Sequence, residues 1–431
     1  MRRRDFLRKT TAVAAAGVGM PYFVPSHVLA GPNRKGANDK FQIGFIGPGR
    51  RAQALILNEN LFDHARIVAA ADCFPRIMDE MEAKTEERFP GQGGWRKYHD
   101  HRDLLEKEKL DAVFVTTPTH ARALICIHAF QAGMDVYAEK PLTLTIVEGR
   151  AIANAAKKHK RILQVGSQQR SMPINRYASK LVREGAIGKI REVLTCNYAP
   201  GTEWEPKPGQ PIPEGMNWDM WCNQTELRPF HEQLRTRWGL YWDYDGGGQS
   251  WGVTGWGTHA LDQVQCALGT DDTGPVEIWP ESEGPHCPVT MRYANGTLLK
   301  LANPRREGYD DLGAIFVGEK GTIEIVRGSA RANPPELLKD APPDYPSVRP
   351  GEVVAHFDNF FECMRTRKEP NACAEIAHRA TTVCHLVNAC RDLGRKIHWN
   401  PVAEEFPGDE EANNNRMRAR PRRKGYELPV I

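Results

Sequence analysis

The sequence predicts an α/β fold in which a parallel-sheet domain comes first and an α+β domain with a large, mostly antiparallel open sheet follows. Two observations carry this prediction. Between residues 41 and 165, short apolar runs alternate with amphipathic stretches of helical spacing. Beyond residue 275, runs with apolar alternation follow one another with turn signals between them. A length of 431 residues is too great for one ordinary core, which agrees with at least two folded units.

Strands alternating with helices define the first domain, which we place at residues 41–165. The expected strands are 41–46, 67–71, 112–116, 135–138 and 162–165. The helical patterns between them cover 51–58, 77–88, 104–108, 120–132 and 146–159. Such a succession forms βαβ units, whose crossover connections are right-handed almost by default.

The second domain is expected at residues 166–400. Apolar alternation predicts strands at 190–199, 276–279, 289–293, 297–301, 314–317 and 322–326, and Asn295-Gly296 between two of them is a strong hairpin signal. Helical patterns cover 355–367 and 375–393. Residues 401–431 carry six basic side chains and are expected to form a basic tail packed at an interface, the alternative being a specific anion site.

The first 30 residues are typical of an export signal. Residues 3–8 (RRDFLR) precede an apolar run at 11–18 and small residues at 28–30. This order of basic, apolar and small residues indicates a signal peptide, and paired arginines before Phe-Leu resemble the twin-arginine signal. The alternative is a basic amphipathic helix that stays on the protein. Residues 31–40 are polar and glycine-rich, so we expect a linker there.

The predicted signal bears on the net charge of the remaining chain and on the compartment in which we expect the protein. Residues 1–30 hold five basic side chains and one acidic side chain, so they account for the whole formal charge of +4. The rest of the chain is near neutral, which gives no general attraction to nucleic acid or to an anionic membrane. We therefore expect a periplasmic protein with no nucleic-acid partner and no stable membrane insertion after signal removal.

A glycine-rich turn directly follows the first expected strand and opens a helix. It reads Gly47-Pro48-Gly49-Arg50-Arg51-Ala52, the dinucleotide-binding fingerprint of a Rossmann domain in its correct setting. Gly47 permits the tight turn, and Gly49 lets backbone N–H groups approach a pyrophosphate. Ala52 lets the helix pack closely on the strand. The positive end of the helix dipole favours the phosphates.

An acidic residue stands where the second strand of a dinucleotide-binding domain places one. Asp72 ends that strand, 25 positions after Gly47. A carboxylate there binds both ribose hydroxyls and repels a 2′-phosphate, so NAD is favoured over NADP. Arg76 nearby could soften this preference and admit NADP.

The loop after the third apolar strand is a further cofactor-binding candidate. It contains Thr117, Pro118 and His120, at the carboxyl end of a parallel strand, where such sheets bind their ligands. For His120 the alternative is a surface role at the start of a helix.

A Glu-Lys-Pro motif ends the next parallel strand, at Glu139, Lys140 and Pro141. Together with the glycine turn and residues 256–262 (WGTHALD), it makes the chain resemble the glucose–fructose oxidoreductase/inositol dehydrogenase (Gfo/Idh/MocA) family over residues 41–400. The resemblance is greatest to exported members with a twin-arginine signal.

The resemblance implies a role for the lysine of this motif. It implies a peptide bond before the proline that is often cis, with Lys140 pointing into the space between nicotinamide and substrate and Glu139 beside the cofactor. An ammonium there can stabilise a developing alkoxide, and a lowered pKa allows proton transfer. The alternative is an ordinary surface lysine at the end of a strand.

The second catalytic candidate is His259. Members of the family commonly carry an Asp four positions before this His, but this chain has Gly255 there. Asp262, one helical turn later, could replace the missing carboxylate, as could Asp243 or Asp245. We expect His259 to act as the base, since its pKa lies near working pH. The alternative is a buried structural histidine.

No metal site is expected. A site built from His259, Asp262 and Asp243 has a spacing that matches no familiar metal centre. The ten cysteines are scattered, without a Cys-x-x-Cys pair.

The aromatic residues of the second domain suggest a carbohydrate substrate. Seven of the ten tryptophans lie between residues 204 and 256, and indole faces suit the C–H faces of sugar rings. For each single Trp, core packing is the alternative. We select Trp256, Asp262 and Arg170 as substrate-binding candidates, the last because it could hold a carboxylate.

These observations predict an NAD(P)-dependent oxidoreductase that acts on a secondary hydroxyl of a sugar, sugar derivative or polyol. One alternative is a glycosidase that uses NAD in a transient oxidation–elimination–reduction cycle without net redox. The second is a non-catalytic sugar-binding protein, which the missing acid at Gly255 would favour. We also expect a homo-oligomer assembled through the sheet of the second domain.

Overall fold

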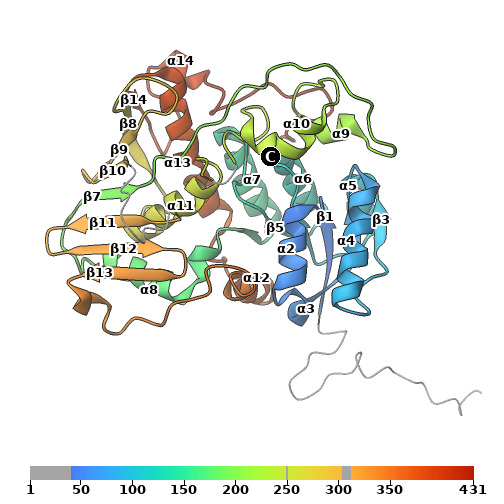
Figure 1. The fold of residues 1–431 in the computed structure, drawn as a ribbon, viewed down its shortest axis with the longest axis horizontal. Helices are drawn as coiled ribbons and strands as arrows, with labels where there is room; N and C mark the ends of the chain where they lie inside the picture. The colour runs from blue at the N-terminus through green and yellow to red at the C-terminus, as the bar shows by residue number, and fades with distance from the viewer. Residues whose placement is uncertain (1–39, 249–250, 303–311) are drawn as a thin grey trace, which may run out of the picture. The chain divides into compact units, whose positions relative to one another are not determined.

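The computed structural model describes residues 40–248, 251–302 and 312–431. Two sheets organise this part of the chain, and Figure 1 shows them in separate halves. The expected signal and linker lie outside the described residues, apart from Lys40. Residues 42–431 pack together as one compact unit.

The first sheet has six strands in the order β3-β2-β1-β4-β5-β6. Its strands are β1 (Phe41–Ile46), β2 (Ala65–Ala71), β3 (Arg96–Tyr98), β4 (Ala112–Val115), β5 (Asp135–Ala138) and β6 (Leu163–Val165). The pairs β1–β4, β4–β5, β5–β6 and β2–β3 are all parallel. The α/β prediction for this domain is therefore confirmed. Strand β3 escaped the sequence analysis because it is three residues long and carries no apolar alternation.

Helices connect these strands as the helical patterns predicted, and a short helix that was not predicted, α3, precedes β2. They are α2 (Arg50–Asn58), α3 (Leu61–His64), α4 (Pro75–Arg88), α5 (His101–Lys107), α6 (Thr119–Gln131) and α7 (Ile146–His159). Side-chain caps start two of them: Asp100 accepts a hydrogen bond from the amide of Arg102, and Thr145 accepts one from the amide of Glu148. Helix α6 is buried along nearly its whole length, which explains its weak amphipathic pattern.

The second sheet has eight strands in the order β13-β12-β11-β7-β10-β9-β8-β14. They are β7 (Ile190–Thr195), β8 (Pro275–Pro280), β9 (Val289–Tyr293), β10 (Leu298–Leu301), β11 (Ala314–Gly318), β12 (Thr322–Val326), β13 (Ser329–Asn333) and β14 (Ile397–His398). Only the pair β7–β10 is parallel among these described strands, so the mostly antiparallel prediction holds. Gly296, at φ +88°, turns β9 into β10 as the Asn-Gly signal predicted.

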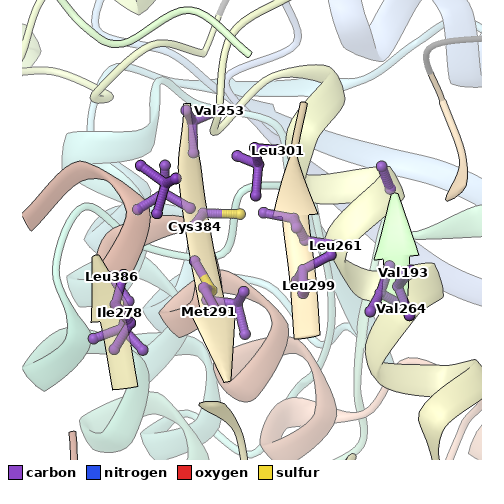
Figure 2. Close-up of a cluster of buried hydrophobic side chains, with 14 of the residues drawn as sticks. Val193, Val253, Leu261, Val264, Ile278, Met291, Leu299, Leu301, Cys384 and Leu386 are labelled. Carbon is purple, nitrogen blue, oxygen red and sulfur yellow. The ribbon is translucent and has the colours of Figure 1, made fainter. Parts of the chain in front are cut away.

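Three helices cover one face of the second sheet: α8 (Pro173–Arg183), α11 (Trp256–Leu268) and α13 (Ala374–Leu393). Figure 2 shows the core between sheet and helices, where Val193 and Leu299 of the strands meet Leu261 of α11 and Cys384 of α13. All four side chains are fully buried. Burying one leucine side chain stabilises a fold by about 1.5–3 kcal/mol. This core holds α11, the helix that carries His259, in place.

Helix α12 (Val354–Thr366) belongs to the first sheet by contact, although it follows the second sheet in sequence. Its Phe357 and Phe360 lie with ring centres 5.7 and 5.9 Å from Phe114 of β4. They also pack on Tyr137 of β5, at 5.4 and 5.7 Å. One face of the parallel sheet is thus completed by a helix from beyond residue 350.

The described residues between 200 and 255 form little regular structure. The short elements here are α9 (Trp218–Cys222), α10 (Glu232–Arg237) and a 3-10 turn at Trp238–Leu240. Figure 1 shows α9 and α10 above α6. The remaining short elements are 3-10 turns at Gln168–Ser171 and Pro335–Leu338 and helix α14 (Glu410–Asn413). Within the described ranges, no helix combines the length and the apolar character that crossing a membrane requires.

Candidate functional site

A cavity of about 720 Å³ lies at the carboxyl ends of strands β1, β2 and β4 of the parallel sheet. It is the site expected for a dinucleotide in such a sheet. Its lining includes the β1–α2 turn, the end of β2 and the β4–α6 loop, through Gly47, Gly49, Arg50, Asp72, Thr117 and Pro118. Six of the predicted cofactor-binding residues therefore share one cavity.

The glycine turn has the geometry that a diphosphate needs. Gly47 has φ +75°, and a Cβ at this position would lie 2.9 Å from the backbone nitrogen of Thr117, so only glycine fits. At Gly49 a Cβ would meet nothing nearer than 4.0 Å, which leaves open space at the start of α2. Ala52 is fully buried against the sheet. Pro48 is buried behind the turn and does not line the cavity. The residues present fit a bound dinucleotide.

Asp72 lies at the far end of the same cavity. Its Oδ1 accepts a hydrogen bond of 2.8 Å from the amide of Phe74. Burial raises the pKa of Asp72 to about 6, although that hydrogen bond and the charge of Arg235 oppose the rise. Arg76, the cation expected to soften the NAD preference, points elsewhere: its side chain is 74% exposed and pairs with Glu80.

His120 does not line the cavity, contrary to both sequence interpretations. It is fully buried, and its Nε2 lies 2.7 Å from the carbonyl oxygen of Trp221 in α9. Its own carbonyl accepts a 2.7 Å hydrogen bond from Gln224. Burial lowers the pKa of His120 to about 4. These two hydrogen bonds of His120 hold residues 221–224 against the start of α6.

Lys140 ends β5, and its peptide bond to Pro141 is cis, as the family resemblance implied. Its Nζ donates a hydrogen bond of 2.9 Å to the carbonyl oxygen of Gly255. Burial lowers the pKa of Lys140 to about 8, while the carboxylates of Glu139 and Asp245 oppose the decrease. The ammonium and the free amine of Lys140 are therefore present in similar amounts near pH 8.

Glu139 belongs to an ion-pair network beside this lysine. Its Oε1 accepts a 2.7 Å hydrogen bond from Arg51 of α2, and Arg51 also lies 3.5 Å from Glu352. Glu139 and Glu352 are both buried. The network joins the start of α2, directly after the glycine turn, to the Glu-Lys-Pro motif and to the segment before α12.

Asp245 is the acid that the structure brings to Lys140. Its buried carboxylate accepts hydrogen bonds from Thr119, at 2.5 Å, and from Thr254. Burial raises its pKa, while the positive charge of Lys140 opposes the rise. The other carboxylate considered from sequence, Asp243, pairs instead with Arg228 at 2.7 Å. A side chain at residue 248 would overlap the Asp245 carboxylate, so Gly248 is what makes room for it.

His259 lies buried in the first turn of α11, and its Nδ1 has no hydrogen-bond partner within the described residues. Burial and the nearby charges of Arg327 and Lys140 hold the pKa of His259 well below its usual value. The imidazole is therefore neutral at neutral pH. Among the described residues, no carboxylate is hydrogen-bonded to Nδ1 of His259 to orient the ring.

The expectation that Asp262 supports His259 is wrong in this structure. Both carboxylate oxygens of Asp262 accept a hydrogen bond of 2.8 Å from Nε of Arg170. Arg170 also donates to Asp271, at 2.7 and 3.0 Å. The guanidinium is thus occupied by two carboxylates of the protein, and both Arg170 and Asp262 are buried. We therefore leave these two residues out of the substrate site proposed below.

Trp256 is half-buried at the start of α11, next to the carbonyl that binds Lys140. Its ring centre lies 4.2 Å from that of Trp251, whose side chain has 54% of its surface exposed. Trp218 and Trp221 stack at 4.4 Å inside the α9 region, and Trp221 also lines the cofactor cavity.

No cluster of three or more His, Cys, Asp or Glu side chains in the described ranges is placed to hold a metal ion. All ten cysteines are described and free of disulfide bonds.

Two family models match most of the chain. The NAD-binding Rossmann fold model of this oxidoreductase family matches residues 41–167, and the C-terminal alpha/beta domain model matches residues 175–428. A glycosyl hydrolase family 109 protein of Shewanella pealeana is 26% identical over 203 residues, 44% of each chain. A myo-inositol 2-dehydrogenase of Thermotoga maritima is 29% identical over 293 residues, which are 65% of this chain and 74% of the relative. The match thus spans less than half of the first of these relatives.

The fold also resembles solved structures. The WlbA dehydrogenase from Bordetella pertussis, in complex with NADH and UDP-GlcNAcA, aligns with a TM-score of 0.58 and 19% identity. The alignment covers 84% of this chain and 99% of that one. The fingerprint cavity, the Glu-Lys-Pro lysine and the two matching domain models lead to one conclusion: this chain belongs to the Gfo/Idh/MocA oxidoreductase family and carries its NAD-binding Rossmann domain.

Proposed function

We propose that the protein is an NAD-dependent oxidoreductase that acts on a secondary hydroxyl of a sugar, sugar derivative or polyol. The observation that carries the proposal is the placement of Lys140. Its amine, with a pKa of about 8, donates a hydrogen bond to the carbonyl of Gly255 and interacts with the charge of the buried carboxylate Asp245. The same parallel sheet presents the fingerprint turn at Gly47 to the dinucleotide cavity.

The chain's own residues would manage the proton of the reaction. A dinucleotide held by the turn at Gly47 and by Asp72 would supply the hydride acceptor, and the proton of the substrate hydroxyl has to go to a group of the protein. The free amine of Lys140 takes that proton, and the carboxylate of Asp245 stabilises the ammonium that forms. The imidazole of His259 on α11 is neutral at neutral pH, so it can donate or accept a hydrogen bond at the substrate hydroxyl.

The aromatic pair favours a carbohydrate as substrate. Trp251 exposes an indole face, and Trp256 directly follows the carbonyl that binds Lys140. Stacking on indole suits the C–H face of a sugar ring, while its hydroxyls remain free for hydrogen bonding. A relative named myo-inositol 2-dehydrogenase agrees with a polyhydroxylated ring.

Replacing the lysine tests this proposal. Lys140→Ala removes the proton acceptor and should lower kcat by about 10²–10⁴. NADH binding, measured by fluorescence titration, should change little because the cavity-lining residues remain. Turnover of an accepted sugar at the wild-type rate would remove Lys140 from the mechanism.

A redox-neutral glycosidase is the second candidate, supported by the relative named a glycosyl hydrolase family 109 protein. In that cycle a ring hydroxyl is oxidised, the glycosidic substituent leaves by elimination, water adds, and the hydride returns. Net consumption is one glycoside and one water. Release of nitrophenol from a nitrophenyl glycoside, without NADH accumulating, would favour this cycle. NADH formation in proportion to substrate would favour the plain dehydrogenase, and sugar binding with no turnover of either kind would favour a non-catalytic protein.

We also propose that the chain is exported through the twin-arginine route. The support is the RRDFLR sequence at residues 3–8 and the apolar run after it. Replacing both Arg3 and Arg4 by Lys should leave the full-length chain in the cytoplasm of an expressing bacterium, whereas the wild type is found in the periplasmic fraction. Equal periplasmic recovery of both forms would contradict the proposal.

A further inference from the structure

The cofactor cavity has a second wall, formed by residues 216–238 of the second domain. Met216, Met220 and Trp221 contribute from the α9 region, and Arg235 and Trp238 contribute from α10 and the turn after it. These side chains line the same cavity as Gly47 and Asp72 of the parallel-sheet domain. A dinucleotide bound there is therefore contacted by both domains.

Arg235 brings a positive charge to the Asp72 end of this cavity. Its guanidinium lies 5.7 Å from the centre of the Phe74 ring, and the Phe74 amide is the group hydrogen-bonded to Asp72. The charges of Arg235 and Asp72 act on each other. Glu232, one turn earlier on α10, accepts hydrogen bonds from Arg235 and holds its side chain in this orientation.

The charge at this end of the cavity decides which dinucleotide is accepted. NAD presents a ribose 2′-hydroxyl here, whereas NADP presents a doubly charged 2′-phosphate. A carboxylate alone accepts a hydrogen bond from the 2′-hydroxyl and repels the 2′-phosphate. A guanidinium within reach attracts the phosphate. This chain has both charges, on opposite domains.

We propose that Arg235 is a specificity-determining residue for the adenosine ribose: it offsets the repulsion between Asp72 and a 2′-phosphate, so that the site binds NADP as well as NAD. The cation that tunes cofactor choice thus comes from the second domain. It does not come from the loop after β2, where Arg76 is turned to solvent.

Dissociation constants for NADH and NADPH, measured by fluorescence titration of the purified full chain, test this proposal. In Arg235→Gln, binding of NADPH should weaken about tenfold, the loss of one charge-assisted contact. Binding of NADH should change less than about twofold. Arg237→Gln is the matched control, because Arg237 lies two residues on in the same helix, is exposed and does not line the cavity.

A second variant tests the proposal without relying on the replacement of Arg235 alone. Asp72→Asn removes the repelling charge and should tighten NADPH binding while weakening NADH binding. Adding Arg235→Gln to Asp72→Asn should again weaken NADPH about tenfold. Raising the salt concentration should reduce the NADPH affinity of the wild type more than that of Arg235→Gln, because the contact is between charges.

Three outcomes would overturn the proposal. The first is equal weakening of NADH and NADPH in Arg235→Gln, which would make Arg235 a general wall contact. The second is unchanged NADPH binding in that variant. The third is a wild type that binds NADH but no NADPH at millimolar concentration. A thermal unfolding midpoint within a few degrees of the wild type shows that each variant is folded.

Discussion

At the scale of single residues, the chemistry of the site depends on how burial shifts the pKa values of three of its side chains. Burial lowers the pKa of Lys140 to about 8 and keeps His259 neutral. It raises the pKa of Asp245 above its usual value. Lys140 is therefore the group best able to accept a proton near neutral pH, and the charge of Asp245 stabilises the ammonium that forms.

The oxidation rate should therefore rise as pH increases through about 8. The free amine of Lys140 is the proton acceptor, and it becomes the dominant form above its pKa. The reverse reduction needs the ammonium, so its rate should fall over the same interval. Profiles of kcat/KM against pH in both directions measure this, and parallel profiles would contradict it.

Asp245→Asn should move that inflection to lower pH. The Asp245 carboxylate favours the ammonium of Lys140, so removing its charge lowers the pKa of the lysine. Asp243→Asn is the control, since Asp243 pairs with Arg228 and should leave the inflection in place. An unchanged inflection in Asp245→Asn would show that this carboxylate does not act on the lysine.

At the scale of elements, the C-terminal segment binds α9 and the parallel-sheet domain together. Arg423 pairs with Asp219 of α9 at 2.7 Å and also donates to the carbonyl of Asn223. Tyr426 donates a 2.9 Å hydrogen bond to the same Asp219. Arg422 pairs with Glu148 of α7 at 2.6 Å, with both side chains nearly buried. Arg422 and Arg423, two of the basic residues expected to form a tail, thus pair with acidic side chains of the same chain.

Arg423→Ala should loosen α9 over the cofactor cavity. It removes the pair with Asp219, which is partly exposed and worth about 1 kcal/mol or less, and the bond to Asn223. We expect faster amide hydrogen exchange in residues 216–224 and faster NADH dissociation. Lys424→Ala, a change at the neighbouring exposed residue, should alter neither. Equal exchange in both variants would show that the segment does not hold α9.

Truncating a side chain of β10 should destabilise the protein strongly only on the face of the strand that packs against the core below α11. Leu299→Ala removes a fully buried side chain of β10 and should lower the free energy of unfolding by about 2–5 kcal/mol. Leu298→Ala, one residue away on the opposite, half-exposed face, should cost less than about 1 kcal/mol. Urea denaturation measures both, and similar losses would contradict the assigned register.

At the scale of the whole molecule, the face of the second sheet away from the helices is the surface we expect to form an oligomer. Leu194 of β7 alternates with the core residue Val193 and is only partly buried. Ile315 of β11 is its register partner and lies on the same face. Covering the partly exposed Leu194 with a second copy would remove it from water, whereas Ile315 is already buried within the chain.

Light scattering after gel filtration should therefore give a multiple of the chain mass. Leu194→Lys should convert that species to a monomer, because a charge cannot be buried in the same contact without a partner. Arg191→Ala, at an exposed residue of the same strand, is the control. A monomeric wild type would contradict the expected assembly.

The local sequence determined most of the elements, because apolar periodicity, glycine turns and caps act over a few residues. Gly47, Asp72, Thr117 and Pro118 could be assigned to one cavity because the carboxyl ends of neighbouring parallel strands meet at one edge. Strand β3, which lacks an apolar pattern, could not be found in this way.

Only the tertiary structure decided which distant side chains meet. Asp245 reaches Thr119 across 126 positions, and His120 reaches Trp221 across 101. Asp262 could bind His259 by helical spacing, yet it binds Arg170, because a buried carboxylate is stabilised more by two guanidinium hydrogen bonds than by a neutral ring. Periodicity records which face of an element is buried, but not which charged group from another element will be buried against it.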